Sequence, residues 1–290
     1  MREPRYDVLF EPVRIGPKTA RNRFFQVPHC NGMGHGHPAA LATMRGVKAE
    51  GGWAVVCTEE VEIHYSSALD PAVEGRLWSD DDIPGHALMV ERVHEHDALA
   101  GIELAHSGLN APNHYTRVAP LGPSARPVSY SGVGQGRAMS LANIAEFRGW
   151  HRDAVVRSIK AGYDIVYVYA GHSLSLLQQF LSPLNNSRAD GYGGSLENRV
   201  RLLREVLEDT RVLCDGHTAV ACRLVVDERL PGGLGRADIE AVFAMIGELP
   251  DLWDLVPGEW DFDSSTSRFE QEGHEEPYVR GFKQIGRAHV

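Results

Sequence analysis

The chain has 290 residues, with 43% hydrophobic residues, 23% charged residues and a formal net charge of −10. This composition is typical of a globular protein with a large core, and the negative charge disfavours partners such as nucleic acid or an anionic membrane. No apolar run approaches the roughly 20 residues that cross a bilayer, and the charged N-terminus lacks the apolar segment of a signal peptide.

Four cysteines lie far apart in the chain, at positions 30, 57, 214 and 222. None belongs to a C-x-x-C pair, so the spacing disfavours zinc and iron–sulfur sites and we predict no metal site within the chain. Sparse cysteines in a chain of this length also fit a reducing compartment, which predicts a cytoplasmic protein.

Six short apolar runs are predicted to be strands, over residues 22–28, 53–63, 99–108, 163–171, 218–226 and 252–258. The runs are mostly continuous, which is typical of parallel strands buried on both faces. Helical patterns precede the third to the sixth run, over residues 82–97, 140–162, 195–213 and 236–249. Ser140 and Ser195 are predicted N-caps, and Gly162 is a predicted C-cap.

The alternation of strands and helices predicts right-handed βαβ crossovers in an α/β fold. No G-x-G-x-x-G follows the first run, which disfavours a dinucleotide-binding fold and favours a (β/α)₈ TIM barrel. About six of the eight βα units are present, so we predict one barrel domain over residues 1–284 that stops before strands 7 and 8. Residues 285–290, "IGRAHV", match the translation of a common sequencing adapter, and we interpret them as a non-native tail rather than a frayed C-terminus.

Active sites of such barrels lie at the C-terminal ends of the strands. The first run ends at His29 and Cys30, and a glycine-rich segment follows that would let a ligand approach the backbone closely. Spacing and compartment argue against a metal-bound or disulfide-bonded Cys30, which leaves a buried filler or a nucleophile. The second run carries Glu59 and Glu60, one of which should point into the barrel mouth toward a cationic substrate.

The later runs carry further polar side chains at or near their ends. Glu103 is a charge in an apolar strand and needs a polar partner. Tyr169 and His172 form a candidate acid–base pair, and Arg223 can stabilise an anion that develops on a cofactor. After the sixth run come three side chains that could hold an ammonium group or polarise a histidine: Trp260, Asp261 and Asp263.

The part of the chain that carries these residues resembles a known family. Residues 178–206, "QQFLSPLNNSRADGYGGSLENRVRLLREV", resemble the signature segment of the old-yellow-enzyme (NADH:flavin oxidoreductase) family of FMN barrels. Four further segments, residues 7–30, 47–59, 164–173 and 252–255, resemble its trimethylamine and dimethylamine dehydrogenase branch. The resemblance extends from about Tyr6 to about Lys283.

The resemblance implies that FMN binds at the barrel mouth and is attached covalently through Cys30 to the flavin C6. It implies that the catalytic residues are Tyr169, His172 and Asp263. It also implies further cofactor contacts from Val27, Pro28, Thr58, Glu103 and Arg223.

The sequence departs from that branch in the pocket that holds the amine. Trp260 matches one aromatic wall, but Glu60 stands in place of a tyrosine and Ala105 in place of a tryptophan. A wider and more anionic pocket is expected, which suits a secondary, tertiary or N-methylated amine. The alternatives are an NAD(P)H-dependent ene-reductase similar to 2,4-dienoyl-CoA reductase, and an inactive fragment whose open sheet edges make it unstable.

The resemblance also implies partners outside this chain. Full-length relatives carry a [4Fe–4S] cluster after the barrel, and the cysteine motif for it does not occur here. The expected acceptor is a protein such as electron-transfer flavoprotein, and the expected assembly is a homodimer.

Overall fold

A parallel sheet forms the centre of the computed structural model, which describes residues 3–69, 74–127 and 134–282. The predicted tail and the end of the predicted domain at residue 284 lie outside these residues. Neighbouring strands of the sheet follow the order β11-β10-β9-β6-β4-β3. Their bounds are β3 Phe25–Gln26, β4 Val55–Glu62, β6 Leu99–Ala105, β9 Ile165–Ala170, β10 Ala219–Asp227 and β11 Leu252–Pro257, and the short β5 Gly75–Arg76 pairs with the end of β4.

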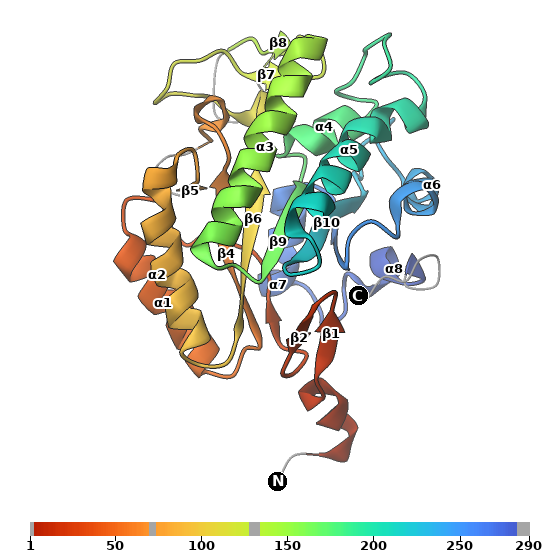
Figure 1. Cartoon of the computed structure of the whole chain (residues 1–290). Helices are drawn as coiled ribbons and strands as arrows, with labels where there is room; N and C mark the ends of the chain where they lie inside the picture. The colour runs from red at the N-terminus through yellow and green to blue at the C-terminus, as the bar shows by residue number, and fades with distance from the viewer. Residues whose placement is uncertain (1–2, 70–73, 128–133, 283–290) are drawn as a thin grey trace.

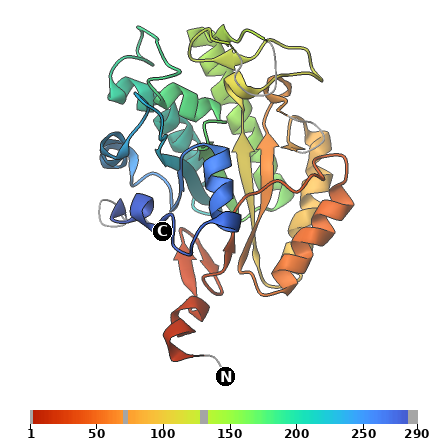
Figure 2. The same cartoon turned by 180° about the vertical axis from the view of Figure 1, so that it is seen from behind.

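Helices cover the outer face of this curled sheet (Figure 1). They are α1 Pro38–Glu50, α2 Ile83–His94, α3 Leu141–Ala161, α5 Leu196–Cys214 and α6 Arg236–Ile246. Helix α7, Trp260–Phe269, lies on the opposite, concave face (Figure 2). The edges β3 and β11 do not pair with each other. The predicted incomplete TIM barrel is confirmed, since the described part of the chain forms an open half-barrel.

Local sequence signals explain where the long helices begin and end. The Ser140 side chain accepts a hydrogen bond from the Asn143 backbone N–H at the start of α3, and Gly162 ends the helix with a φ of 95°. Ser195 caps α5 in the same way by accepting from the Asn198 N–H. All three predicted caps are confirmed.

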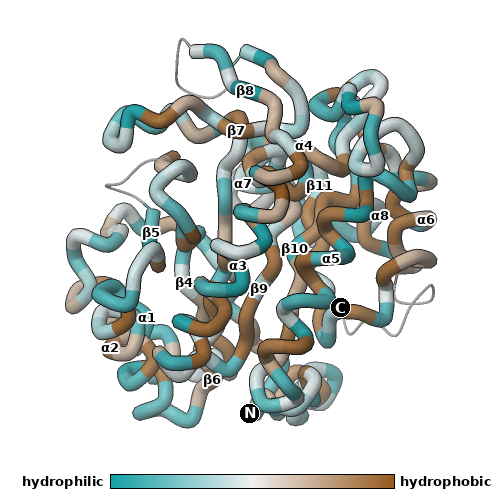
Figure 3. Tube along the Cα trace, turned by 45° about the horizontal axis from the view of Figure 1, so that its top comes forward, coloured by the Kyte–Doolittle hydropathy of each residue, from teal (hydrophilic) through white to brown (hydrophobic). Residues whose placement is uncertain are grey.

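The strands bury side chains on both faces, as their continuous apolar sequences predict. The outer face packs on the helices in the main core, with Ile102, Val168 and Leu224 as examples. The inner face forms a smaller core around Cys57 and Tyr167. Figure 3 shows hydrophobic residues along β9 and β10 in the middle of the molecule.

A hairpin at the N-terminus adds to the inner core. It consists of β1 Val13–Ile15 and β2 Lys18–Ala20, which pair antiparallel. Ile15 and Ala20 are buried against the inner face of the sheet. The hairpin lies at the end of the sheet opposite to the loops that follow the strands (Figure 1), so it leaves the C-terminal ends of the strands open.

Several elements were not predicted from the sequence. Helix α1 buries mainly small residues and Arg45, so its apolar periodicity is weak. The sequence analysis assigned no helix to the segment after the sixth strand, and this segment forms α7. The remaining short elements are η1 Pro4–Phe10, η2 Tyr65–Ser67, η3 Asp80–Asp82, η4 Gly108–Asn110, β7 Leu121–Gly122, β8 Arg137–Ala138, α4 Leu176–Leu181 and α8 Glu276–Val279.

Among the described helices, none combines the length and apolar character that a bilayer crossing requires.

Candidate active site at the strand ends

Three side chains form a hydrogen-bonded chain at the C-terminal end of the sheet. The Tyr169 hydroxyl lies 2.6 Å from His172 Nδ1, and His172 Nε2 lies 3.1 Å from Asp263 Oδ2. Tyr169 is the penultimate residue of β9, His172 follows that strand, and Asp263 comes from α7 across the concave face. Burial first, and then the carboxylates of Glu60 and Glu103, raise the pKa of Tyr169 well above its ordinary value. The phenol therefore stays neutral.

The backbone at His172 adopts a conformation that residues other than glycine rarely take. His172 has a φ of 61° and Ser173 a φ of 59°, both in the left-handed region. Such residues cluster at functional sites because surrounding contacts must hold them there. Here the Ser173 N–H donates to Gln178 Oε1 over 2.8 Å, which holds the turn that presents His172.

A buried ion-pair network lies on the inner face beside Tyr169. Arg223 of β10 donates from Nε to Asp254 Oδ2 over 2.8 Å, and its Nη1 lies 3.2 Å from Glu103 Oε2. Burial alone would lower the pKa of Arg223, but Asp254 and Glu103 raise it well above its ordinary value, so the guanidinium stays charged. Glu103 needed a polar partner on sequence grounds, and Arg223 provides it. Burial nevertheless raises the pKa of Glu103 to about 7.

The segment that carries Cys30 is held by two buried arginines. Arg223 Nη1 donates to the Pro28 carbonyl over 3.1 Å, and Arg45 Nη2 donates to the His29 carbonyl over 2.7 Å. The His29 N–H donates to the Thr58 carbonyl over 3.1 Å. Pro28 thus lies in the segment that carries Cys30, and Thr58 binds that segment at His29.

Cys30 contacts a carboxylate that the sequence analysis did not single out. Its Sγ lies 3.1 and 3.3 Å from the two oxygens of Glu74, directly before β5. Cys30 is exposed at the surface, whereas the other three cysteines are buried. Desolvation by surrounding atoms, and then Glu74, raise the pKa of the Cys30 thiol, so it is protonated in this state. The buried-filler interpretation of Cys30 is therefore wrong.

The predicted substrate residues occupy different parts of the mouth. Glu60 is buried on β4, and burial followed by Glu74 and Glu103 raises its pKa well above the ordinary value. Its neighbour Glu59 instead pairs with Arg45. Ala105 packs against Tyr169 and Leu174. Trp260, at the start of α7, and Val27, after β3, are 46% and 42% exposed. Asp261 is also exposed, on α7.

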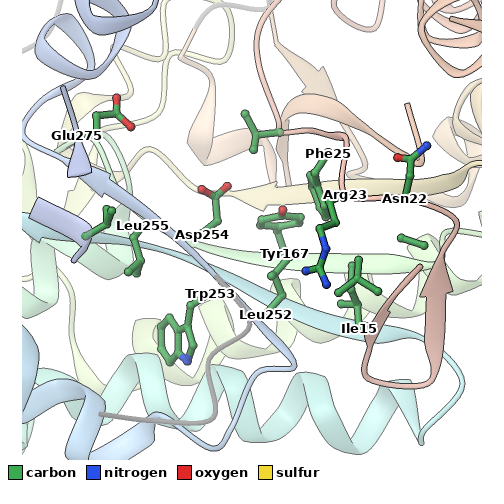
Figure 4. Close-up of a pocket in the computed structure, with 14 residues that line it drawn as sticks. Ile15, Asn22, Arg23, Phe25, Tyr167, Leu252, Trp253, Asp254, Leu255 and Glu275 are labelled. Carbon is green, nitrogen blue, oxygen red and sulfur yellow. The ribbon is translucent and has the colours of Figure 1, made fainter. Parts of the chain in front are cut away.

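A largely apolar cavity of about 390 Å³ lies below this mouth, between the edges β3 and β11 (Figure 4). Phe25, Tyr167 and Asp254 project toward it, whereas Trp253 points to the other side of the sheet. Tyr167 pairs in register with Ala221, and Tyr169 with Arg223. The cavity therefore lies one inward-facing layer nearer the N-terminal end of the strands than Tyr169 and Arg223.

The buried polar groups at the mouth suit a heteroaromatic ring with both donor and acceptor edges. Glu60 Oε1 and Glu103 Oε2 accept no hydrogen bond from the described residues, although both are buried. A buried carboxylate oxygen without a donor is costly, so a ligand N–H can satisfy it. The charged Arg223 offers donors to a ring oxygen or nitrogen. Flavin presents both kinds of edge, and the residues fit it. Within the described ranges, no three His, Cys, Asp or Glu side chains group as metal ligands.

The described residues form part of a parallel α/β barrel with a polar site at the C-terminal ends of its strands, which is where such barrels bind substrates and cofactors. The model of the NADH:flavin oxidoreductase / NADH oxidase family matches residues 8–284, and the chain belongs to this family of FMN-binding flavoproteins. It is 35% identical to dimethylamine dehydrogenase from Hyphomicrobium sp. (strain x), an alignment that covers 98% of this chain and 40% of that protein. It is 34% identical to an NADPH dehydrogenase from Halalkalibacterium halodurans over 78% of this chain and 65% of that protein.

Two solved structures share the fold closely. Histamine dehydrogenase from Rhizobium sp. 4-9 has a TM-score of 0.94 and 46% identity, covering 98% of this chain and 42% of that one. The 6-hydroxypseudooxynicotine amine oxidase HisD from Pseudomonas geniculata N1 has a TM-score of 0.95 and 45% identity, covering 99% and 44%. The chain thus spans about two fifths of the length of the amine-oxidising relatives it matches.

Proposed function

We propose that this chain is the FMN-binding barrel of an amine dehydrogenase that oxidises a C–N bond of a small secondary, tertiary or N-methylated amine. The observation that carries the proposal is the Tyr169–His172–Asp263 chain beside the buried Arg223. The similarity to dimethylamine dehydrogenase, histamine dehydrogenase and the amine oxidase HisD supports it.

In this proposal the mouth holds the FMN ring through several contacts. Cys30 would tether it covalently, and Arg223 would face its N1–C2 oxygen edge. Glu103 Oε2, which accepts no hydrogen bond from the described residues, would accept a ring N–H. Three residues on or just after the neighbouring strands β3 and β4 would complete the contacts with the ring: Val27, Pro28 and Thr58. Bound FMN would accept two electrons from the substrate.

The role of the polar chain is to prepare the amine. With the His172 proton on Nε2, that N–H donates to Asp263, and Nδ1 accepts the Tyr169 O–H. The remaining lone pairs of the Tyr169 oxygen can then accept a hydrogen bond from a substrate ammonium. This arrangement would set the protonation state of the amine before its oxidation.

Three residues of the pocket would select the substrate. Trp260 offers an aromatic face to an ammonium group, and Ala105 leaves room beside Tyr169. Glu60 has a buried oxygen that accepts no hydrogen bond from the described part of the chain, and a second ammonium or ring N–H of the substrate would satisfy it.

The proposal extends to the organisation of the intact protein. Residues 1–284 would form one barrel domain, and 285–290 would be non-native. Electrons would leave FMN through a [4Fe–4S] cluster outside this chain, toward an acceptor such as electron-transfer flavoprotein. The protein would be cytoplasmic and homodimeric.

An assay on the intact gene product separates this proposal from an NADPH-dependent ene-reductase, which the similarity to NADPH dehydrogenases favours. Steady-state rates are measured with amines plus an artificial electron acceptor, and with NADPH plus an enone. We expect turnover with amines and a flavin that stays on the polypeptide after acid denaturation. Enone reduction without amine oxidation would overturn the activity, and release of all flavin by acid would overturn the covalent tether.

A further inference from the structure

Cys30 and Glu74 form a hydrogen bond in which the thiol is placed to lose its proton to the carboxylate. The thiol is the donor and the carboxylate is the acceptor, with Sγ 3.1 and 3.3 Å from Oε1 and Oε2. A cysteine attacks as a thiolate, so its proton must first move to a base. Glu74 is the base that touches the sulfur.

The structure holds Glu74 firmly against the segment that carries the cysteine. The side chain is 4% exposed, and its backbone carbonyl accepts the His35 N–H over 3.2 Å. Because His35 follows Cys30 by only five residues, this bond fastens both residues to the same loop. The buried Glu60 Oε1 nearby accepts no hydrogen bond from the described residues, so an N–H of a ligand beside the pair would satisfy it.

We propose that Glu74 is the proton acceptor that activates Cys30 for thioether formation with the flavin. This inference rests on the proposed covalent FMN tether and assigns it a base. Glu74 would act once in the life of each protein molecule, during cofactor attachment, and the amine reaction would not need it.

The attachment step balances with dioxygen as the oxidant. The thiol proton passes to a Glu74 oxygen, and the sulfur electron pair forms the new S–C bond at flavin C6. The hydrogen on that carbon leaves as a proton, and two electrons pass to dioxygen. Thiol, flavin C–H and O₂ therefore give thioether and one equivalent of hydrogen peroxide.

The surroundings of Glu74 set the pH at which it can act. Carboxylates face it from two strands, namely Glu59, Glu60 and Glu62 on β4 and Glu103 on β6, while the positive charge of Arg223 on β10 acts on Glu60. Burial first, opposed by the Cys30 hydrogen bond, and then these carboxylates raise the pKa of Glu74 to about 8. Since the base must be ionised to accept a proton, attachment should speed up as the pH rises through about 8.

The test measures attachment itself on the intact gene product. Apoprotein is mixed with saturating FMN in air, samples are quenched with acid, and covalent flavin is quantified by intact mass and by flavin fluorescence of the denatured chain. Gel filtration without acid measures non-covalent FMN separately. First-order rate constants at saturating FMN are compared, so weaker binding in a variant does not mask the step.

We expect Glu74→Gln to attach FMN at least roughly 100-fold more slowly at pH 9, the range for loss of a proton acceptor. Glu74→Asp, which keeps a carboxylate, should recover part of the rate, and peroxide should form in step with the thioether. Glu62→Gln is the matched control, because it removes a neighbouring carboxylate and leaves the acceptor of Cys30 in place.

The possible results are distinguishable. Attachment in Glu74→Gln at the wild-type rate, with the wild-type pH dependence, would overturn the role of Glu74 and leave the tether standing. Absence of covalent flavin in the wild-type protein would overturn the tether itself. An equal loss of rate in Glu62→Gln at pH 9 would also contradict the assignment, because the effect would then be one of local charge or packing.

Discussion

Arg45 and Glu59 form an ion pair that is sealed inside the protein. Arg45 Nη2 lies 3.3 Å from Glu59 Oε2, and the two side chains are 0% and 1% exposed. The same guanidinium binds Gln26 Oε1 over 2.9 Å and the His29 carbonyl. One buried side chain of α1 thus connects β4 with the segment that leads to Cys30.

Replacing Arg45 should therefore destabilise the fold strongly. Arg45→Met leaves the Glu59 carboxyl buried without its partner, and breaking a buried pair costs about 3–5 kcal/mol of unfolding free energy. Urea unfolding measures the loss. Arg92→Met is the control, because its partner Glu95 and Arg92 itself are about half exposed, and it should cost less than about 1 kcal/mol. Equal losses in the two variants would contradict this prediction.

The Tyr169 hydroxyl should matter for turnover more than for stability. Tyr169→Phe removes the group that contacts His172 Nδ1, and we expect kcat with the amine to fall roughly 100-fold, the scale of acid–base assistance. The unpaired His172 nitrogen should cost about 1–3 kcal/mol of stability at most. Dye-linked amine oxidation measures kcat across pH. Tyr192→Phe, whose hydroxyl binds Glu205, should retain the wild-type rate. A wild-type kcat and pH profile in Tyr169→Phe would exclude the proposed role.

Glu60 should select between amines that differ in charge. A hydrogen bond to a charged group contributes about 1.5–3 kcal/mol, so Glu60→Gln should raise KM for a diamine by about 10-fold or more. For a monoamine of equal length, KM should stay unchanged or fall. Steady-state kinetics with both substrates gives the ratio. A uniform change for the two amines would show that Glu60 affects the pocket without reading the second charge.

The pair His94–Asp164 should make stability depend on pH. His94 Nε2 lies 2.7 Å from Asp164 Oδ2, and this hydrogen bond raises the pKa of His94 above its ordinary value, against partial burial. The pair therefore stabilises the protein fully below the unfolded pKa of about 6.5. That contribution disappears as the pH rises through the folded pKa.

The measurement compares unfolding free energies of wild type and His94→Gln. The deficit of the variant should be larger at about pH 5.5 than at about pH 9, on either side of the histidine transition. His96→Gln is the control, since His96 forms no ion pair among the described residues. A deficit that grows toward alkaline pH would reverse the sign and refute the assignment.

The sequence predicted the sheet, because its strands are continuous apolar runs. It also predicted much of the site, because a charged residue within an apolar run is easily recognised. Glu103 and Arg223 were both identified in this way, and they meet on the inner face. Tyr169 and His172 are three residues apart, so their contact is local. The contact of His172 with Asp263 depends on how α7 crosses the sheet, and no periodicity fixes that. The residue roles remain predictions.

The residues that the sequence analysis missed have a common physical reason. Glu74 precedes a two-residue strand, where there is no pattern to place it. Arg45 is buried on a helix of small residues, whereas arginine normally indicates an exposed face. Asp254 resembled Glu103 as a charge within an apolar run, and its pairing with Arg223 follows only from the register of β10 and β11.

The two arginines that bind the carbonyls of Pro28 and His29 have a consequence for how this segment moves. The His29 amide is bonded to β4, and the two carbonyls are bonded to buried side chains of β10 and α1. Loosening the segment therefore requires opening both the barrel interior and the helix layer. Amide hydrogen exchange at His29 should be as slow as in β4 itself, although the residue is at the surface. The position next to Cys30 would belong to the last part of the molecule to unfold.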